Sequence, residues 1–306
     1  MASILNAYLS ADEVVLAQGL IDTHHDLQIE QRETQADFHL SKNEAIYRMV
    51  KVACWQLGFI NKDAEVIALA WSKKTKSLAQ FNPHHWPSDL LDFDIDHTST
   101  QAFLSCPKNL GLYVVAPSAL WVERLAKAGV QTIQLRFKSD QTELIEAEIQ
   151  QAIACVKNYS CHLFINDHWQ LAIDHQAYGV HLGQEDIASA DLLAIARAGL
   201  RLGISSHGYA EMLRAVSYQP SYIALGAIFP TTLKLMETAP QGLGRLRRYA
   251  QLLKDYALVG IGGVDENNMT QVISSGVGSV AVVRAVIQSD DYPASIHKLQ
   301  SYFMSN

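Results

Sequence analysis

Cysteine, net positive charge and long apolar runs are all scarce in this sequence. Its four cysteines show no CxxC spacing, so we expect reduced, buried thiols in a cytosolic protein. The net charge of −7 excludes the basic surface typical of nucleic-acid-binding proteins. No segment approaches the roughly 18 apolar residues of a membrane span, and residues 1–10 lack the pattern of a signal peptide. The sequence therefore predicts neither a nucleic-acid partner nor a membrane partner.

The overall composition is that of an ordinary globular protein. The chain has 306 residues, enough for one large domain and one small one. Its hydrophobic fraction of 49% and charged fraction of 18% are typical of soluble domains. Because the net charge is negative, an anionic substrate would have to be attracted by a local cluster of cations.

The first third of the chain carries no motif with evident chemistry. Ser41 and Glu44 have the spacing of a capping box ahead of a helical pattern. The apolar run Glu65–Trp71 is predicted to form a buried strand. We therefore expect residues 1–106 to form a small α/β appendage that is dispensable for the chemistry of a larger domain, residues 107–306.

From Gly111 onward, apolar runs alternate regularly with helical patterns. Strands are predicted at Leu112–Val115, Thr132–Arg136, Leu163–Asn166, Gly179–Leu182, Arg201–Ser205, Tyr222–Gly226, Leu258–Gly262 and Ser279–Val283. Helical patterns follow each of them. Eight βα units predict a compact α/β protein with the (β/α)8 TIM-barrel fold, and an open doubly wound sheet is the alternative. Polar residues at nearly every predicted strand end favour the barrel.

The stretch His162–Asp186 shows this organisation most clearly. Two short apolar runs, each followed by polar residues, flank a segment long enough for one short helix. Strand, helix and strand at this spacing form a βαβ unit of a parallel sheet. Asp167 and Asp186 would then lie on adjacent strand ends and face one site. Paired carboxylates with an open front suit Mg²⁺, so the sequence predicts a magnesium site there.

Other predicted strand ends carry groups suited to phosphate. Gln134, Arg136 and Lys138 alternate onto the barrel mouth, where a planar guanidinium and a point charge fit phosphate oxygens. The remaining strand ends carry Ser205 to His207, the long segment Gly226 to Lys234, the glycine run Gly260 to Gly263, and Val283 with Arg284. Glycines let a ligand approach the backbone, and phosphate sites recur after the last two strands of such barrels. A tight turn, a helix cap or a solvated strand end would explain each signal alone, whereas their joint placement favours an active site.

On these motifs, residues 111–306 resemble the thiamine phosphate synthase family. The matches run in family order: QLRFK (134–138), IND (165–167), GVHLGQED (179–186), GISSH (203–207), GAIFPTT with a later lysine (226–234), GLGRL (242–246), GIGGV (260–264) and AVVRAV (281–286). Of these, HLGQED and the FPT segment followed by GIGG are the most specific. The resemblance implies transfer of the 4-amino-5-hydroxymethyl-2-methylpyrimidine group from its diphosphate to 4-methyl-5-(2-phosphoethyl)thiazole, which gives thiamine phosphate and pyrophosphate.

The resemblance also implies a role for individual residues. Asp167 and Asp186 would bind Mg²⁺; Arg136, Lys138, Asn166, Lys234 and Ser205 would hold the diphosphate; Gln134 and His207 would lie at the pyrimidine end; and Thr231, Thr232, Gly263, Val283 and Arg284 would surround the thiazole phosphate. Arg136, Lys138, Lys234 and Ser205 would be the catalytic members of this set.

The expected chemistry agrees with the residue types. An electron-rich aminopyrimidine can expel pyrophosphate and leave a stabilised cation, which the thiazole nitrogen then captures. The protein then has to stabilise charge on the leaving group, for which a divalent ion and fixed cations suffice. No Ser-His-Asp or Cys-His set is evident, in agreement with this scheme.

Three positions depart from the family pattern. His168 replaces a usual arginine, Leu233 replaces a threonine, and Arg284 replaces a serine. The alternative function is a non-catalytic or tautomerase-like relative that binds a thiamine-related ligand and regulates. Such a protein would be expected to lose the metal carboxylates or the Arg–Lys pair, and this chain keeps both.

Overall fold

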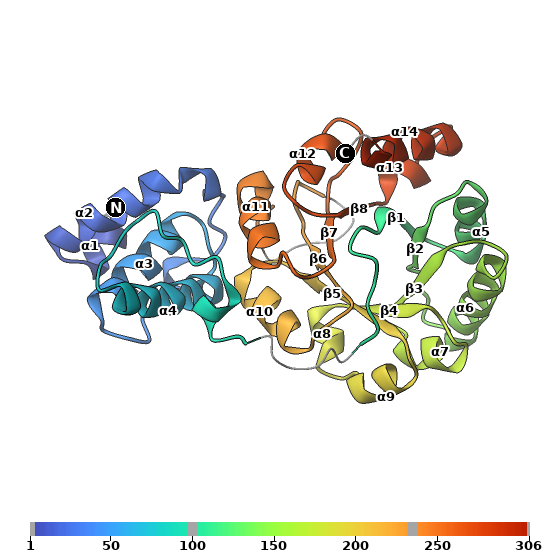
Figure 1. Cartoon of the computed structure of the whole chain (residues 1–306), viewed down its shortest axis with the longest axis horizontal. Coiled ribbons are helices and arrows are strands. Elements are labelled where there is room, and N and C mark those ends of the chain that lie inside the picture. The colour runs from blue at the N-terminus through green and yellow to red at the C-terminus, as the bar shows by residue number, and fades with distance from the viewer. Residues whose placement is uncertain (1–3, 97–102, 232–237, 305–306) are drawn as a thin grey trace.

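A closed eight-stranded barrel lies beside a helical N-terminal unit (Figure 1). The computed structural model describes residues 4–96, 103–231 and 238–304. The strands are all parallel and pair in sequence order from β1 to β8, and β8 pairs with β1 to close the barrel. The predicted (β/α)8 barrel is therefore confirmed, and the open sheet is excluded.

Each barrel strand lies where the sequence predicts it, to within one residue at either end. The strands are β1 Gly111–Ala116, β2 Thr132–Leu135, β3 His162–Asn166, β4 Gly179–Leu182, β5 Arg201–Ser206, β6 Tyr222–Leu225, β7 Leu258–Ile261 and β8 Ser279–Val282. Nearly all of their residues are buried, because helices cover the outside and side chains fill the inside. That is why most of the strands appear in the sequence as short, mainly apolar runs.

The barrel helices form the outer ring. They are α5 Ala119–Lys127, α6 Thr142–Val156, α7 Trp169–Asp174, α8 Gln184–Ile187, α9 Leu192–Arg197, α10 Tyr209–Ser217, α11 Gly242–Leu252, α12 Met269–Ile273, α13 Arg284–Ile287 and α14 Tyr292–Met304. The sequence did not predict the short helices α8 and α13. Both follow strand ends directly, so they place Asp186 and Arg284 in the first turn of a helix.

Among its described residues, the N-terminal unit contains helices and no strand, which corrects the predicted α/β appendage. It contains α1 Ile4–Tyr8, α2 Ala11–Thr23, α3 Ala45–Gln56 and α4 Asn61–Leu78, with 3-10 turns η1 His25–Leu27, η2 Gln35–Asp37 and η3 Leu90–Phe93. The predicted strand Glu65–Trp71 is wrong, because this segment is the middle of α4. Ile67, Ala68 and Trp71 are buried there, and a short apolar run fits a buried helix as well as a buried strand.

The predicted capping box before α3 is also wrong. The helix begins at Ala45 with Glu44 as its N-cap, so Ser41 lies outside it. The Ser41 hydroxyl instead donates to Glu65 Oε1 at 2.5 Å. Ser41 therefore connects the start of α3 to α4, a tertiary role that its local spacing could not indicate.

The N-terminal unit packs on one side of the barrel (Figure 1). α4 contacts α10, and η1 contacts α11. The Arg245 guanidinium, 2% exposed, donates from Nε to the carbonyl of Leu27 (2.9 Å) and from NH2 to that of Leu57 (3.0 Å). A buried cation that satisfies two carbonyls of the other unit fixes how the units meet. Loss of Arg245 would remove the side-chain donor to Leu27 and one of two donors to Leu57, whose carbonyl also accepts from the Ile29 N–H.

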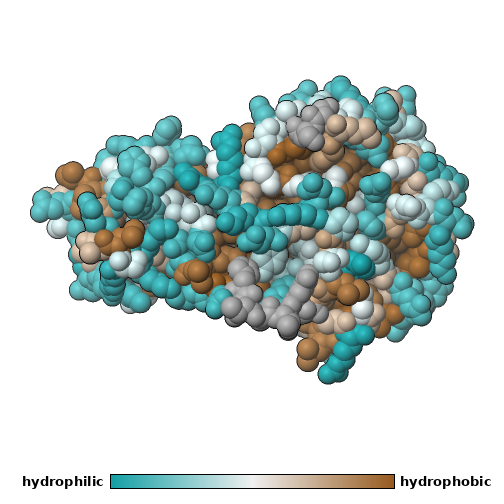
Figure 2. All heavy atoms as spheres, in the orientation of Figure 1, coloured by the Kyte–Doolittle hydropathy of each residue, from teal (hydrophilic) through white to brown (hydrophobic). Residues whose placement is uncertain are grey.

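The hydropathy of the surface and the helices of the described residues can be compared with those of membrane proteins. Figure 2 shows hydrophilic side chains over most of the face in view, with apolar ones in separate patches. Within the described ranges, no helix is long and apolar enough to cross a membrane.

Candidate active site

Several predicted site residues meet at the carboxyl ends of the first barrel strands. Gln134 of β2 is buried and donates from Nε2 to Asn166 Oδ1 of β3 at 2.6 Å. Its Oε1 accepts from the hydroxyl of Tyr113 at 3.0 Å, and that hydroxyl lies 2.8 Å from the hydroxyl of Tyr222. Because Tyr113 has only one hydroxyl proton, Tyr222 must donate to Tyr113. Asn166 accepts through its oxygen, which keeps its amide N–H groups available for a ligand oxygen.

The same chain of hydrogen bonds continues to the fifth strand. Tyr222 lies 2.7 Å from Nδ1 of His181, and Nε2 of His181 lies 2.7 Å from Oγ of Ser205. The Tyr222 proton is already used, so Nδ1 of His181 must donate to Tyr222. In the neutral ring Nε2 then accepts from Ser205. This orders a continuous hydrogen-bond network across the barrel interior, with the predicted Ser205 at one end and Asn166 at the other.

Sequence reasoning missed three members of this network, Tyr113, His181 and Tyr222. All three are buried, and burial raises the pKa of both tyrosines, so their hydroxyls stay protonated as donors. The aromatic rings pack on one another and on Phe164 inside the barrel. One signal was available: a histidine inside an otherwise apolar strand has to find polar partners within the barrel.

The two predicted metal carboxylates are neighbours at the mouth. Asp167 directly follows β3, and its backbone N–H donates to the carbonyl of His181 at 3.0 Å. Burial raises the pKa of Asp167, and the charge of Asp186 raises it further, while Arg136 acts in the opposite direction. Asp186 accepts through Oδ2 from the N–H of Gly183 at 3.1 Å, so it also caps α8. The pair thus concentrates negative charge in a partly buried place, next to a fixed cation.

The residues present fit a divalent cation with an incomplete protein ligand set. Among the described residues, no group of three or more His, Cys, Asp or Glu side chains could enclose a metal ion. Mg²⁺ is commonly held by one or two carboxylates together with waters and substrate phosphates. Asp167 and Asp186 supply hard oxygen ligands of that kind, and a cation would relieve the repulsion that raises the pKa of Asp167.

The cations predicted after β2 lie at the same edge. Arg136 continues the strand, since its N–H donates to the Ala116 carbonyl at 2.9 Å, and its side chain is half-buried. Lys138 is exposed. Arg136 is close enough to influence Asp167, so a positive and a negative group share this part of the mouth. Arg136 could bind phosphate oxygens of a ligand, beside the carboxylates that would hold a divalent cation.

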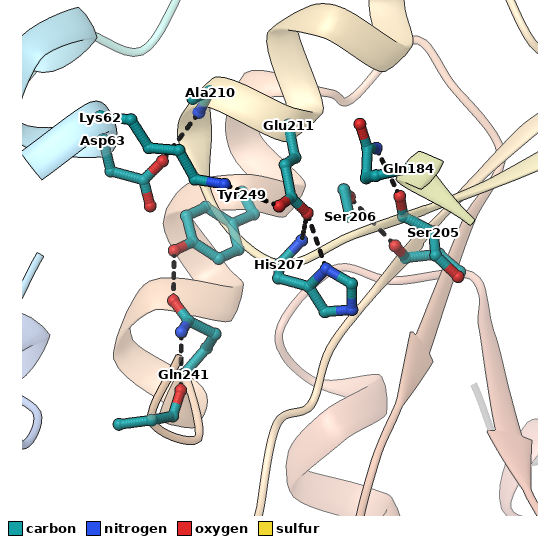
Figure 3. Close-up of polar contacts among 12 residues, drawn as sticks. Lys62, Asp63, Gln184, Ser205, Ser206, His207, Ala210, Glu211, Gln241 and Tyr249 are labelled. Carbon is teal, nitrogen blue, oxygen red and sulfur yellow. Dashed lines mark hydrogen bonds and ion pairs between the residues drawn. The ribbon is translucent and has the colours of Figure 1, made fainter. Parts of the chain in front are cut away.

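His207 lies on the loop between β5 and α10. Its Nδ1 is 2.6 Å from Oε2 of Glu211, and its backbone N–H donates to the same oxygen at 2.9 Å (Figure 3). The carbonyl of Ser205, two residues earlier, accepts from Nε2 of Gln184 at 2.7 Å. The loop is therefore held on two sides, by α8 and by the first turn of α10.

The loops expected to bind the thiazole phosphate are described only in part. Thr231 is half-buried, while Thr232, Leu233 and Lys234 lie outside the described residues. Gly263 has a left-handed φ of 67°, and a Cβ there would lie 2.7 Å from the carbonyl oxygen of Pro230. Only glycine fits that conformation and that contact, so the loops after β6 and β7 pack directly on each other.

The loop after β8 is short. Val283 is the N-cap of α13, and Arg284 is the first residue of that helix. Both are half-buried. Arg284 thus lies at the edge of the mouth, beyond the end of the last strand.

A comparison of the sequence with protein families assigns this barrel. The family model described as thiamine monophosphate synthase matches residues 112–286, which include every barrel strand apart from the first residue of β1. The chain belongs to the thiamine monophosphate synthase family. The predicted family, and with it the predicted transferase function in thiamine phosphate synthesis, is confirmed.

Relatives in the synthase family are close in sequence and in fold. The chain is 53% identical over 200 residues to the thiamine-phosphate synthase of Serratia proteamaculans, which covers 65% of this chain and 94% of that protein. It is 51% identical over 197 residues to the thiamine-phosphate synthase of Klebsiella pneumoniae, with 64% and 93% covered. The solved thiamine phosphate pyrophosphorylase of Pyrococcus furiosus superposes with a TM-score of 0.57 at 27% identity, covering 65% of this chain and 98% of that one. The helical N-terminal unit lies outside the synthase family match.

Proposed function

We propose that the barrel binds two small-molecule substrates, hydroxymethylpyrimidine diphosphate and thiazole phosphate, and that it requires Mg²⁺. The observation that carries this proposal is the carboxylate pair at the mouth, Asp167 and Asp186, beside Arg136 in a chain of this family. A bound Mg²⁺ would neutralise charge on the diphosphate as it leaves. In this proposal residues 107–306, which contain the barrel, form the catalytic domain, and residues 1–106 form an added unit.

The chain's own residues have distinct tasks in this proposal. Arg136, Lys138 and Lys234 stabilise the pyrophosphate, and each well-placed contact of this kind contributes about 3 kcal/mol to the transition state. Asn166 donates through its amide, because its oxygen is already occupied by Gln134. Ser205 offers its oxygen, because its proton is directed to His181.

Loss of the leaving group from the aminopyrimidine needs no protein nucleophile. The ring's electrons stabilise the cation that remains, and the thiazole nitrogen forms the new C–N bond. The buried network from Asn166 to Ser205 holds the site rigid, so that it need not reorganise during the reaction.

The thiazole phosphate is assigned to the other side of the mouth. Thr231, Thr232, Gly263 and the loop with Val283 and Arg284 surround it in this proposal. Arg284 would compensate for two hydroxyls that the family pattern leads us to expect, since a charge-assisted contact is roughly twice as strong as a neutral one. Arg284→Ala should raise KM for thiazole phosphate about ten- to a hundredfold and leave KM for the pyrimidine diphosphate almost unchanged. Equal changes in both KM values, or none, would exclude this role.

One assay tests the function as a whole. The full chain is incubated with both substrates and Mg²⁺, and thiamine phosphate and pyrophosphate are measured. Stoichiometric formation of both products is the expected result. Tight binding of a thiamine-related ligand without turnover would instead indicate the regulatory alternative. The four cysteines are free thiols, which supports the further proposal that the enzyme acts in the cytoplasm.

A further inference from the structure

The N-terminal unit contacts the barrel beside the His207 loop, at the carboxyl-end face of the strands. The first turn of α4 lies against α10, the helix that follows the His207 loop (Figure 3). Lys62 and Asp63, neighbours in that turn, make separate contacts with the barrel. The family match does not include either residue, so whatever they contribute is specific to the extended chain.

Lys62 contacts the carboxylate that holds His207. Its Nζ lies 3.0 Å from Oε1 of Glu211, while Oε2 of the same carboxylate accepts from the imidazole and the backbone N–H of His207. Figure 3 shows Glu211 between the two. Each carboxylate oxygen therefore has its own partner, one in each unit. The lysine fixes the orientation of the carboxylate that fixes the ring.

The charge state of Glu211 supports this arrangement. Burial by itself raises the pKa of Glu211, but the hydrogen bonds and charges of His207 and Lys62 outweigh burial and bring the pKa to about 2. The group is therefore an acceptor throughout the working pH range. An ionised carboxylate can only accept, so Nδ1 of His207 carries the proton that it donates to Oε2 of Glu211.

Asp63 holds the turn itself. Its Oδ1 accepts from the N–H of Ala210 at 2.9 Å, within the first turn of α10. A Cβ at Gly208 would lie 2.0 Å from Oδ2 of Asp63, so the carboxyl packs on the backbone directly after His207. On the same turn, Tyr209 accepts through its hydroxyl from Nε1 of Trp86 at 2.8 Å. Lys62, Asp63 and Trp86 of the N-terminal unit thus contact residues 208–211.

We propose that Lys62 is a positioning residue for the synthase reaction, acting through Glu211 on the imidazole of His207. The N-terminal unit then contributes to the pyrimidine end of the site without touching the substrate. This inference depends on the proposed place of His207 at that end. Lys62 itself is half-exposed, with a side-chain exposure of 50%, so as a simple surface ion pair it would contribute little to stability.

The chain offers a matched control for Lys62. Lys73, also on α4, has a side-chain exposure of 51% and pairs with Asp94 inside the N-terminal unit. Lys62→Met and Lys73→Met therefore remove the same charge from the same helix, and only the first should affect the site. Lys62→Met should raise KM for the pyrimidine diphosphate about three- to tenfold, with KM for thiazole phosphate and Tm nearly unchanged. Lys62→Arg should restore most of the loss.

A double-variant comparison separates this inference from its premise. In the His207→Ala background, adding Lys62→Met should have no further effect on KM. A full additional effect there, or equal effects of Lys62→Met and Lys73→Met, would overturn the inference. If His207→Ala alone leaves both KM values unchanged, the inference and the placement of His207 both fail. The synthase function itself is tested separately, by turnover of the wild-type protein.

Discussion

Carboxyl groups lie both at the barrel mouth, where they are half-buried, and at the interface between the units, where Asp63 is buried; burial raises the pKa of a group in each place. At the mouth, Asp167 has a second carboxylate, Asp186, as its next largest influence, and this raises its pKa further. At the interface, burial raises the pKa of Asp63 to about 6, against the opposing effects of the Ala210 N–H and the Arg245 guanidinium. After burial, the largest influence on Asp167 is a like charge, whereas the largest influence on Asp63 is a hydrogen-bond donor.

The difference shows what a raised pKa does and does not indicate. Perturbed pKa values collect at functional sites, but ion-pair and capping sites perturb them as well. The contacts decide between the two cases. Asp63 is satisfied by the protein and completes the start of α10, so it needs no ligand. Arg136 offsets the repulsion between Asp167 and Asp186 only in part, because the pKa of Asp167 stays raised, which makes the mouth the metal-binding candidate.

Neutralising the mouth carboxylates should have the largest effect of the substitutions suggested by this comparison. Asp167→Asn and Asp186→Asn would each remove a negative ligand of the proposed Mg²⁺, so kcat should fall about a hundred- to a thousandfold. EDTA should abolish turnover of the wild type. Asp191→Asn is the control, because Asp191 only caps α9 and asparagine caps equally well. Undiminished turnover in EDTA, or in the double Asn variant, would refute a metal-assisted reaction.

Asp63, the carboxyl group at the interface, should make the free energy of unfolding depend on pH. The pKa of about 6 in the folded protein exceeds the ordinary value of 3.8, so the folded state binds this proton more tightly. The stabilisation is fully present below about pH 4 and is lost as pH rises through 6, about 3 kcal/mol in all. Asparagine cannot titrate and can still accept from Ala210. Denaturant unfolding at pH 4 and pH 7.5 should therefore show that the free energy of unfolding of Asp63→Asn increases, relative to that of the wild type, from the lower pH to the higher.

Asp37, an exposed carboxyl group, serves as a check because its effect on stability should change with pH in the opposite direction. Hydrogen bonds from Thr34 lower the pKa of Asp37, so its stabilisation is present at neutral pH and is lost on acidification. Asp37→Asn should therefore lose stability relative to wild type as pH rises. A flat difference for Asp63→Asn across the same range would mean that the interface carboxyl is not buried in solution.

The barrel was predictable because its pattern is local. Strands buried on both faces appear as short apolar runs, and their polar ends appear in the next one to three residues, as at Asn166 and Asp167. The network inside the barrel was not predictable in this way. The hydrogen bond between Tyr113 and Tyr222 joins positions 109 residues apart, and that between His181 and Tyr222 joins positions 41 apart.

The N-terminal unit was harder for the same reason. A seven-residue apolar run gave no means of distinguishing strand from helix in α4. The pairing of Asp63 with Ala210 spans 147 residues, and a charged residue that is buried only on docking resembles a surface residue in the sequence. Its contacts with α10 and α11 also make the expectation that residues 1–106 are dispensable a point to test in the full chain.

The smallest expected effect is that of adding a single methyl group, by a glycine-to-alanine substitution, where the two units pack on each other. Alanine is more stable than glycine inside a helix by about 1 kcal/mol. A Cβ added at Gly19 in α2 would have no atom of the described residues within 4 Å, so Gly19→Ala should stabilise. Gly244 in α11 differs, because a Cβ there would lie 2.0 Å from the carbonyl oxygen of Asp26. Overpacking of this kind costs about 1–3 kcal/mol, which outweighs the helix preference. Thermal unfolding should therefore give a lower Tm for Gly244→Ala and a higher one for Gly19→Ala. If both variants gain stability, η1 does not pack on α11 in solution as the structure places it.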